Sequence, residues 1–170
     1  MKKGLLIICL ALLSANAIAA DKPPKQIGEF KKWSAYVMQQ NGQKVCYVIG
    51  LPDKMEGKYS SRGDTYIMIT HRPPGSMNVV SIHPGYDYPD DYKAKVKIDK
   101  KTYEFSSNKD TPNTAWLADD NDSKVAAALG SGSKMVVNGE SKKGTKTVDT
   151  YVLSGASLAL KAAKNACKSK

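Results

Sequence analysis

Two histidines, His71 and His83, are the only imidazole side chains in this chain of 170 residues, and they limit the chemistry that it can do. Neither has a second His, Cys or carboxylate at the spacing of a metal site. The sequence holds no G-x-S-x-G nucleophile motif, and the Ser and Gly residues at 130–133 lack the lysine of a phosphate-binding loop. We therefore expect no enzyme and no catalytic, metal-binding or cofactor-binding residue. A Ser, His and Asp brought together only in space is the alternative.

The first twenty residues have the pattern of a secretory signal peptide. Lys2 and Lys3 precede an apolar run over residues 4–13, and small residues follow at 17–20. A bilayer-spanning helix needs about twenty apolar residues, so this run is too short to be a lasting anchor. We expect cleavage near Ala19 or Ala20, no transmembrane segment, and a mature protein in the periplasm, secreted or on the cell surface.

Only two of the three cysteines remain after this cleavage. Cys9 leaves with the signal peptide, and Cys46 and Cys167 remain in an oxidising compartment. No C-x-x-C motif or neighbouring His and Cys residues suggest a redox or metal site. Such an isolated pair predicts a structural disulfide between Cys46 and Cys167.

The mature chain is strongly basic. Loss of Lys2 and Lys3 lowers the number of Lys and Arg residues from 26 to 24 against 16 Asp and Glu, which leaves a net charge of +8. This charge favours an anionic partner, such as an envelope surface, a glycan or an acidic protein, and it allows peripheral membrane contact. The export signal argues against nucleic acid. A basic turn at Lys142–Lys146 is one candidate contact, and simple solvated turn chemistry is its alternative.

Two further segments are candidates for partner binding. A Pro-rich loop over residues 83–92 carries Tyr86, Tyr88 and Tyr92, and tyrosines offer large contact area at a low cost in conformational entropy. Lys95 and Lys97 alternate with apolar residues on the following strand and present a basic face. The alternatives are tyrosines that fold back over the sheet edge, and lysines that only solvate an exposed face and discourage edge pairing.

The elements that must position these residues are mainly strands. Period-two patterning between turn signals predicts a single antiparallel β-sandwich-like domain over residues 31–170, after a flexible N-terminal arm at 21–30. The expected strands cover residues 33–37, 45–49, 65–71, 77–82, 93–98, 102–105, 134–138 and 146–153. Capping residues and Ala-rich runs predict two short helices at Asp120–Leu129 and Ser154–Cys167, the second tethered by the disulfide.

An ordered set of residues resembles the invasion-associated locus B family of exported alphaproteobacterial proteins. The set covers almost the whole mature chain, and no single motif in it is chemically specific. Its members are Trp33, Cys46–Tyr47–Val48, Met68–Pro73, Trp116, Asp119–Asp120, Gly132, Met135–Val137, Gly139, Ser141, Gly144–Thr145, Asp149, Tyr151–Gly155 and Cys167. Ala156 departs from the pattern, because a bulky aromatic residue is expected after the Gly of the last turn.

The resemblance implies an exported β domain with a terminal helix and no established catalytic residue or cofactor. The family takes its name from host-cell invasion, although relatives also occur in free-living bacteria. We therefore expect a non-enzymatic envelope or secreted protein that binds a macromolecular or envelope partner and contributes to host-cell interaction or invasion. The alternative is a periplasmic small-ligand carrier or hydrolase.

Overall fold

A computed structural model describes residues 23–117 and 121–168, and it confirms a mainly β chain with two helices. The expected signal peptide at 1–20, with its cleavage site near Ala19 or Ala20, lies outside these residues. The eleven strands are β1 (Lys25–Phe30), β2 (Trp33–Gln40), β3 (Gln43–Gly50), β4 (Lys54–Gly57), β5 (Tyr66–His71), β6 (Val79–His83), β7 (Lys93–Ile98), β8 (Lys101–Ser107), β9 (Ala115–Leu117), β10 (Lys134–Glu140) and β11 (Lys146–Val152). The helices are α1 (Asp122–Ser131) and α2 (Ala156–Lys168).

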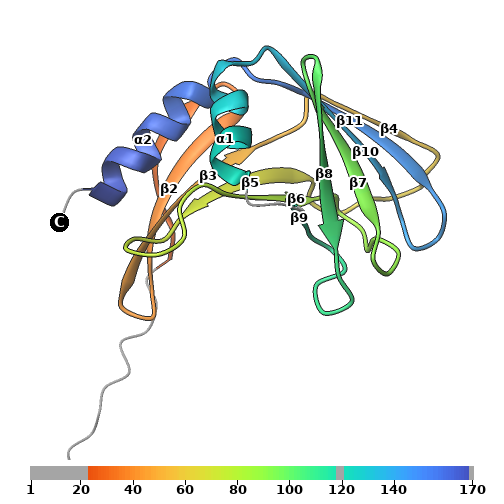
Figure 1. Cartoon of the computed structure of the whole chain (residues 1–170), viewed down its shortest axis with the longest axis horizontal. Coiled ribbons are helices and arrows are strands. Elements are labelled where there is room, and N and C mark those ends of the chain that lie inside the picture. The colour runs from red at the N-terminus through yellow and green to blue at the C-terminus, as the bar shows by residue number, and fades with distance from the viewer. Residues whose placement is uncertain (1–22, 118–120, 169–170) are drawn as a thin grey trace, which may run out of the picture.

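All strands belong to one antiparallel sheet in the order β1-β2-β3-β5-β6-β9-β8-β7-β10-β11-β4. β4 follows β3 after only three residues, yet it pairs with β11 at the opposite edge. The sheet must therefore curl, and Figure 1 shows β2, β3 and β5 on one side and the β7–β8 and β10–β11 hairpins on the other. Its two halves face one another as the layers of a sandwich do, although they are joined through β6 and β9.

One hydrophobic core fills the space inside the curl. It takes Trp33, Val48 and Ile69 from the first half and Val96 and Tyr151 from the second, all fully buried. The Trp33 indole donates a hydrogen bond to the carbonyl of Val152 at 2.9 Å, which joins the two halves directly. Inward residues alternate with outward ones along β7, β10 and β11, as expected for a sheet with one solvated face.

Helix α2 covers the inner face of β1, β2, β3 and β5 next to this core (Figure 1). It buries Ala156, Ala159 and Ala163, and these small side chains let the helix axis approach the sheet closely. Gly155 precedes it with φ +105°, and a side chain there would collide with the carbonyl of Phe30. Ala156, where the sequence departs from the pattern it resembles, is the first residue of this helix and is fully buried.

Helix α1 packs against β6 and α2. It ends at Ser131, two residues beyond the expected Leu129, because the N–H of the capping residue Gly132 still donates to the Ala128 carbonyl. The carboxylate of Asp122 accepts a hydrogen bond from Val80 N–H at 2.7 Å, which fixes the start of the helix to β6.

The structure corrects the expected N-terminal arm. Residues 25–30 of the segment 21–30 form β1, which pairs with β2, and the partly buried Phe30 packs against the core. The sequence pattern missed it because a Gly at 28 and a register shift between residues 26 and 28 break the alternation. β4 and β9 were also not expected, since they have only four and three residues.

Candidate functional site

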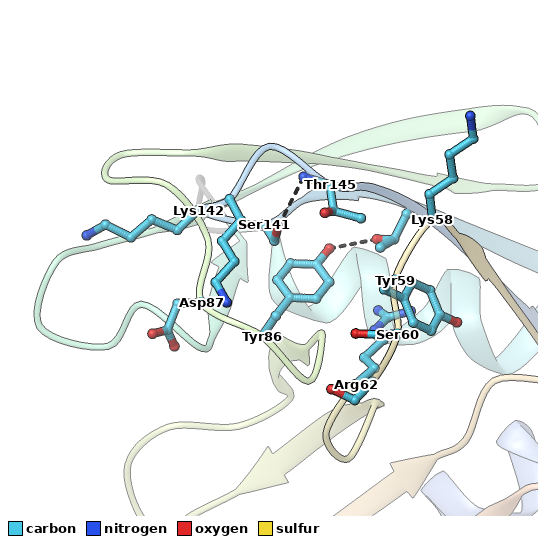
Figure 2. Close-up of a pocket in the computed structure, with 12 residues that line it drawn as sticks. Lys58, Tyr59, Ser60, Arg62, Tyr86, Asp87, Ser141, Lys142 and Thr145 are labelled. Carbon is cyan, nitrogen blue, oxygen red and sulfur yellow. Dashed lines mark hydrogen bonds between the residues drawn. The ribbon is translucent and has the colours of Figure 1, made fainter.

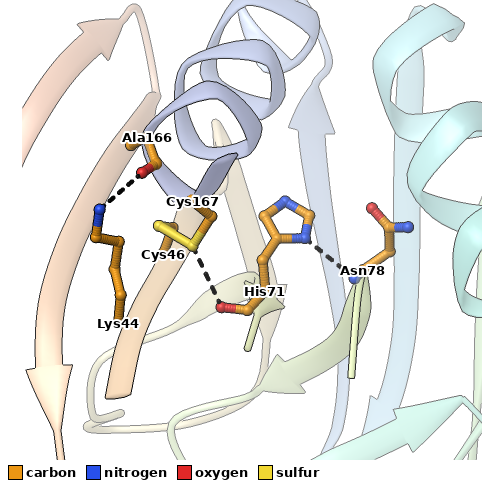
Figure 3. The surroundings of a disulfide bond; sticks show 6 residues. All are labelled: Lys44, Cys46, His71, Asn78, Ala166 and Cys167. Atoms are coloured by element: carbon orange, nitrogen blue, oxygen red, sulfur yellow. Dashed lines mark hydrogen bonds between the residues drawn. A yellow bond between two sulfur atoms is a disulfide. The ribbon is translucent and has the colours of Figure 1, made fainter. Parts of the chain in front are cut away.

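The predicted disulfide is present. Cys46 on β3 and Cys167 in the last turn of α2 are bonded, with Cα atoms 5.8 Å apart and a sequence separation of 121 (Figure 3). Lys44 donates a 3.4 Å hydrogen bond to the carbonyl of Ala166, at the C-terminal end of the helix where positive charge is favoured. The disulfide therefore fixes the C-terminal end of α2 to β3, in the first half of the sheet.

The tyrosine-rich loop does not present its tyrosines as a common surface. Tyr88 is fully buried, stacks on Tyr92 with centroids 5.3 Å apart, and meets Tyr86 edge-on. The prediction that Tyr88 contacts a partner is therefore wrong. Burial of its aromatic ring in the core has a more favourable free energy than exposure of the ring to water. Tyr86 and Tyr92 are half-buried, so the loop folds back over the end of the sheet.

Lys95 and Lys97 lie where the sequence predicts, on the solvated face of β7. They are exposed, while Ala94, Val96 and Ile98 between and beside them are buried. In the sheet, Lys95 stands opposite Asn138 and Lys97 opposite Val136 of β10. Their role in binding a partner stays a prediction.

A different arrangement brings the tyrosine loop and the basic turn together in one cleft. Three segments form it: the chain after β4, the start of the loop after β6, and the turn between β10 and β11. Figure 2 shows Tyr86 in the middle, between Ser141 and Lys142 on one side and Tyr59 and Arg62 on the other. This cleft, hereafter the basic cleft, has a volume of about 530 Å³ and is lined by Lys58, Tyr59, Ser60, Ser61, Arg62, Tyr86, Asp87, Ser141, Lys142, Lys143, Thr145 and Thr147.

Backbone hydrogen bonds fix the turn that carries two of its lysines. Ser141 N–H donates to the carbonyl of Thr145 at 2.9 Å, and Thr145 N–H donates to the Ser141 hydroxyl at 3.2 Å. Lys142 N–H donates to the carbonyl of Asp87 at 2.7 Å, which joins the turn to the tyrosine loop. The basic turn and the loop are therefore held as one wall.

The wall of the cleft around Tyr86 is equally constrained. Its hydroxyl lies 2.7 Å from the Thr147 hydroxyl, and Gly139 leaves no room for a side chain beside it. Burial raises the pKa of Tyr86 to about 12, although the Thr147 hydrogen bond and the nearby Arg62 charge oppose the shift. At neutral pH this phenol therefore keeps its proton and acts as a hydrogen-bonding group.

Arg62 is committed to the protein itself. Its two terminal nitrogens donate to the two carboxylate oxygens of Asp149, each at 2.6 Å, and its Nε donates to the carbonyl of Pro84. Its guanidinium also lies over the rings of Tyr59 and Tyr86, 5.5 and 5.0 Å from their centroids. Burial alone would lower the pKa of Arg62. The hydrogen bonds to Asp149 and the negative charge of that carboxylate have the larger effect and raise the pKa of Arg62 above its usual value.

The free positive charge of the basic cleft therefore comes from Lys58, Lys142 and Lys143. Lys142 makes one exposed ion pair with Asp90 at 3.3 Å, a kind of contact that holds a side chain only weakly. Ammonium groups beside several hydroxyls match the oxygens of a phosphate, sulfate or carboxylate. The arrangement can bind an anionic group.

The histidines lie apart from this cleft. His71 is buried near the disulfide, where its Nδ1 accepts a 3.1 Å hydrogen bond from Asn78 N–H and the Cys167 sulfur lies 3.8 Å from its carbonyl oxygen (Figure 3). Burial and the charge of Lys164 lower the pKa of His71. Burial likewise lowers the pKa of His83, whose two ring nitrogens lie 3.2 Å from the hydroxyls of Ser81 and Thr114.

The described part of the chain holds neither a metal-binding cluster nor a helix that could span a membrane. Within residues 23–117 and 121–168, no three His, Cys, Asp or Glu side chains are grouped so that they could hold a metal ion. Over the same residues, no helix has both the length and the apolar character that crossing a membrane requires.

Fold and site together define a small antiparallel β domain, closed by a disulfide, with a basic cleft at the β10–β11 turn. No protein-family model matches the chain, and no curated protein matches it. Among solved structures, the crystal structure of invasion associated protein B from Bartonella henselae is similar, with 17% sequence identity and a TM-score of 0.57 over 87% of this chain and 100% of that chain. A likeness at this identity concerns the fold, and it agrees with the family resemblance of the ordered residues.

Part of the cleft could be predicted from the sequence. Tyr86 and the turn at Lys142–Lys146 were expected, but as separate candidates. Lys58, Tyr59 and the Arg62–Asp149 pair were not expected, because residues 58–65 have no regular pattern and ion pairing across 87 positions leaves no local signal.

Proposed function

We propose that this chain is an exported, non-enzymatic protein of the periplasm or cell surface that binds an anionic group of an envelope or host partner in the basic cleft. The observation that carries the proposal is the convergence of Lys58, Lys142 and Lys143 with seven hydroxyl side chains and one carboxylate in one cleft. A cation-lined concave site attracts anionic partners more strongly than the same charges spread over a flat surface.

Two observations support export. The N-terminal sequence has the three parts of a signal peptide. The Cys46–Cys167 bond belongs in an oxidising compartment, since cytosolic proteins keep such thiols reduced. A contribution to host-cell interaction or invasion is part of the proposal, and it rests on the family resemblance and on the name of the structural neighbour.

One observation favours the hydrolase alternative. His83 lines a hollow of about 340 Å³ together with Asp64 and Asp87, and an imidazole that shares a cavity with carboxylates is a common feature of acid–base catalysis. Against it, both ring nitrogens of His83 lie beside hydroxyl groups and not beside a carboxylate. Ser81, the hydroxyl beside Nε2, is only 3% exposed and offers no route to a substrate. Binding is therefore the better supported function.

The test is co-sedimentation of the purified mature protein with isolated envelope membranes at low and at raised salt. Replacement of Lys58, Lys142 and Lys143 by Glu should abolish binding, because these exposed side chains carry the charge of the cleft. Lys95→Glu with Lys97→Glu is the control, since it also lowers the net charge, but on another face of the sheet. The proposal would be overturned if neither raised salt nor the cleft substitutions weaken binding. It would also be overturned if only the control variant loses binding.

A further inference from the structure

The basic cleft adjoins two further hollows. A middle hollow of about 340 Å³ shares Tyr86 and Asp87 with the cleft. An end hollow of about 530 Å³ shares Gly63, Asp64 and Tyr66 with the middle one. The shared residues place the three in a row, and the 3.0 Å hydrogen bond from Gly63 N–H to the Gly85 carbonyl fixes the segment along which they lie.

Aromatic rings stand between the members of this row. Tyr86 lies between the basic cleft and the middle hollow, and Tyr66 between the middle and end hollows. Tyr66 stacks on His83 with centroids 4.3 Å apart, and Tyr36 in the end hollow stacks on Tyr47 at 5.1 Å. Because neighbouring rings already order these side chains, a ligand that lies against them would cost little conformational entropy.

The charge of the hollows changes along the row. The basic cleft has three lysines, and the middle hollow has Asp64, Asp87 and the amide of Asn113. The end hollow has one lysine, Lys32, and one carboxylate, Asp64, so its charges balance, and two of its apolar side chains, Leu51 and Met55, are 47% and 48% exposed. A ligand that fits all three must carry negative charge at one end only, hydrogen-bonding groups next to it, and apolar faces beyond.

An oligosaccharide with one acidic end meets these requirements. A sugar ring has C–H groups on its faces, which suit the negative face of an aromatic ring, and hydroxyls around its edge, which suit carboxylates and amides. A uniformly charged polymer or an anionic bilayer does not meet them, because Asp64 and Asp87 would repel its continued charge.

We propose that the three hollows form one extended site for an acidic oligosaccharide, with a phosphate or carboxylate group at Lys58, Lys142 and Lys143 and neutral sugar rings against Tyr66 and Tyr36. This inference rests on the proposed function for its charged end. The chemistry is shared by phosphorylated bacterial envelope glycans and by sialylated host glycans, and the probes below separate these two sources.

The test is titration calorimetry of the mature protein with soluble, lipid-free glycans. The probes are a phosphorylated core oligosaccharide released from lipopolysaccharide, a sialylated oligosaccharide, the uncharged form of each, and heparin as a uniformly sulfated polymer. At least one acidic probe should bind more tightly than its uncharged form and more tightly than heparin. The probe that binds identifies the source.

Variants then test the extension beyond the basic cleft. Tyr66→Ala should weaken binding of the acidic oligosaccharide about two- to tenfold, whereas Tyr66→Phe keeps the ring and should bind as the native protein does. Asn113→Trp, at an exposed position, should block the middle hollow without touching the core. Tyr103→Ala, another half-buried tyrosine that lines none of the three hollows, is the control.

The outcomes separate this inference from the proposed function. If the lysine variant loses binding but Tyr66→Ala and Asn113→Trp do not, the extended site is wrong and the basic cleft stands. If no soluble glycan binds, or if the uncharged forms bind equally well, the oligosaccharide proposal is overturned. Binding only to vesicles that contain phosphatidylglycerol would overturn it in favour of a membrane surface.

Discussion

Arg62 and Asp149 form a bidentate ion pair that is almost completely shielded from water. Their side chains are only 4% and 2% exposed, and the pair joins the segment between β4 and β5 to the middle of β11. The Arg62 side chain also lines the basic cleft, so the same contact that supports the cleft removes Arg62 from the charge available to a ligand. The cleft is thus built on a cation that its ion pair holds in place, whereas its other cations, Lys58, Lys142 and Lys143, are exposed.

Removing one partner of this pair should destabilise the fold strongly. Asp149→Asn leaves a buried guanidinium without its counter-charge, at a cost of about 3–5 kcal/mol in the free energy of unfolding. The double variant Arg62→Met with Asp149→Leu should lose much less, because no unpaired charge remains. Urea unfolding of the two proteins measures the difference. Equal losses in both would show that the charge itself is unimportant.

The disulfide should account for much of the stability of α2. Its two cysteines are 121 positions apart, and the chain-entropy model gives a loop of this size on the order of 4–5 kcal/mol. Cys167→Ser should lower the melting temperature and raise amide hydrogen exchange in α2 first, since a short Ala-rich helix depends on its packing and tether. Cys46→Ser should have the same effect. Full reaction of the native protein with a thiol reagent before reduction would contradict the bond.

Much of the fold could be predicted from the sequence because local patterns determine it. The alternation of Lys93, Lys95 and Lys97 with Ala94 and Val96 gives the strand and also which face is buried. The disulfide could be predicted because only two cysteines remain once the signal peptide is removed. By contrast, β1, β4 and β9 are strands only because the curled sheet provides partners for them, and their own residues show no clear alternation.

The site could be predicted only in fragments. Tyr86, Tyr88 and Tyr92 are tyrosines of the same Pro-rich loop and cannot be told apart in the sequence, yet Tyr88 is buried and Tyr86 borders the cleft. Tertiary contacts make the difference: the turn at 141–145 packs against the loop, and Gly139, which has no side chain, leaves space for Tyr86. No spacing in the sequence encodes that contact.

The two histidines should make the fold less stable in mild acid. Burial lowers the pKa of both His71 and His83, so below the unfolded-state pKa of about 6.5 the unfolded chain binds protons that the folded chain does not. Their contribution is thus complete above that pH and is lost as the pH falls toward the folded-state pKa, at no more than about 1.4 kcal/mol per pH unit for each. Urea unfolding at several pH values measures this slope.

His71→Asn tests which group is responsible. An Asn oxygen can still accept the hydrogen bond from Asn78 N–H, but the side chain no longer titrates. The variant should therefore show a shallower loss of stability in acid than the native protein. An unchanged slope would assign the effect to His83 or to carboxylates instead.

Tyr86 and Tyr88 should respond in opposite ways to the loss of one hydroxyl group. Tyr86→Phe removes the hydrogen bond to Thr147, so a cost of about 0.5–1.5 kcal/mol is expected. The Tyr88 hydroxyl is buried and finds no hydrogen-bond partner among the described residues, so Tyr88→Phe should be neutral or stabilising. Tyr88→Ala, in contrast, should cost about 3–5 kcal/mol, because the whole ring fills the core. Urea unfolding orders the three variants, and a Tyr88→Phe protein as unstable as Tyr88→Ala would show that the hydroxyl, not the ring, holds this loop against the sheet.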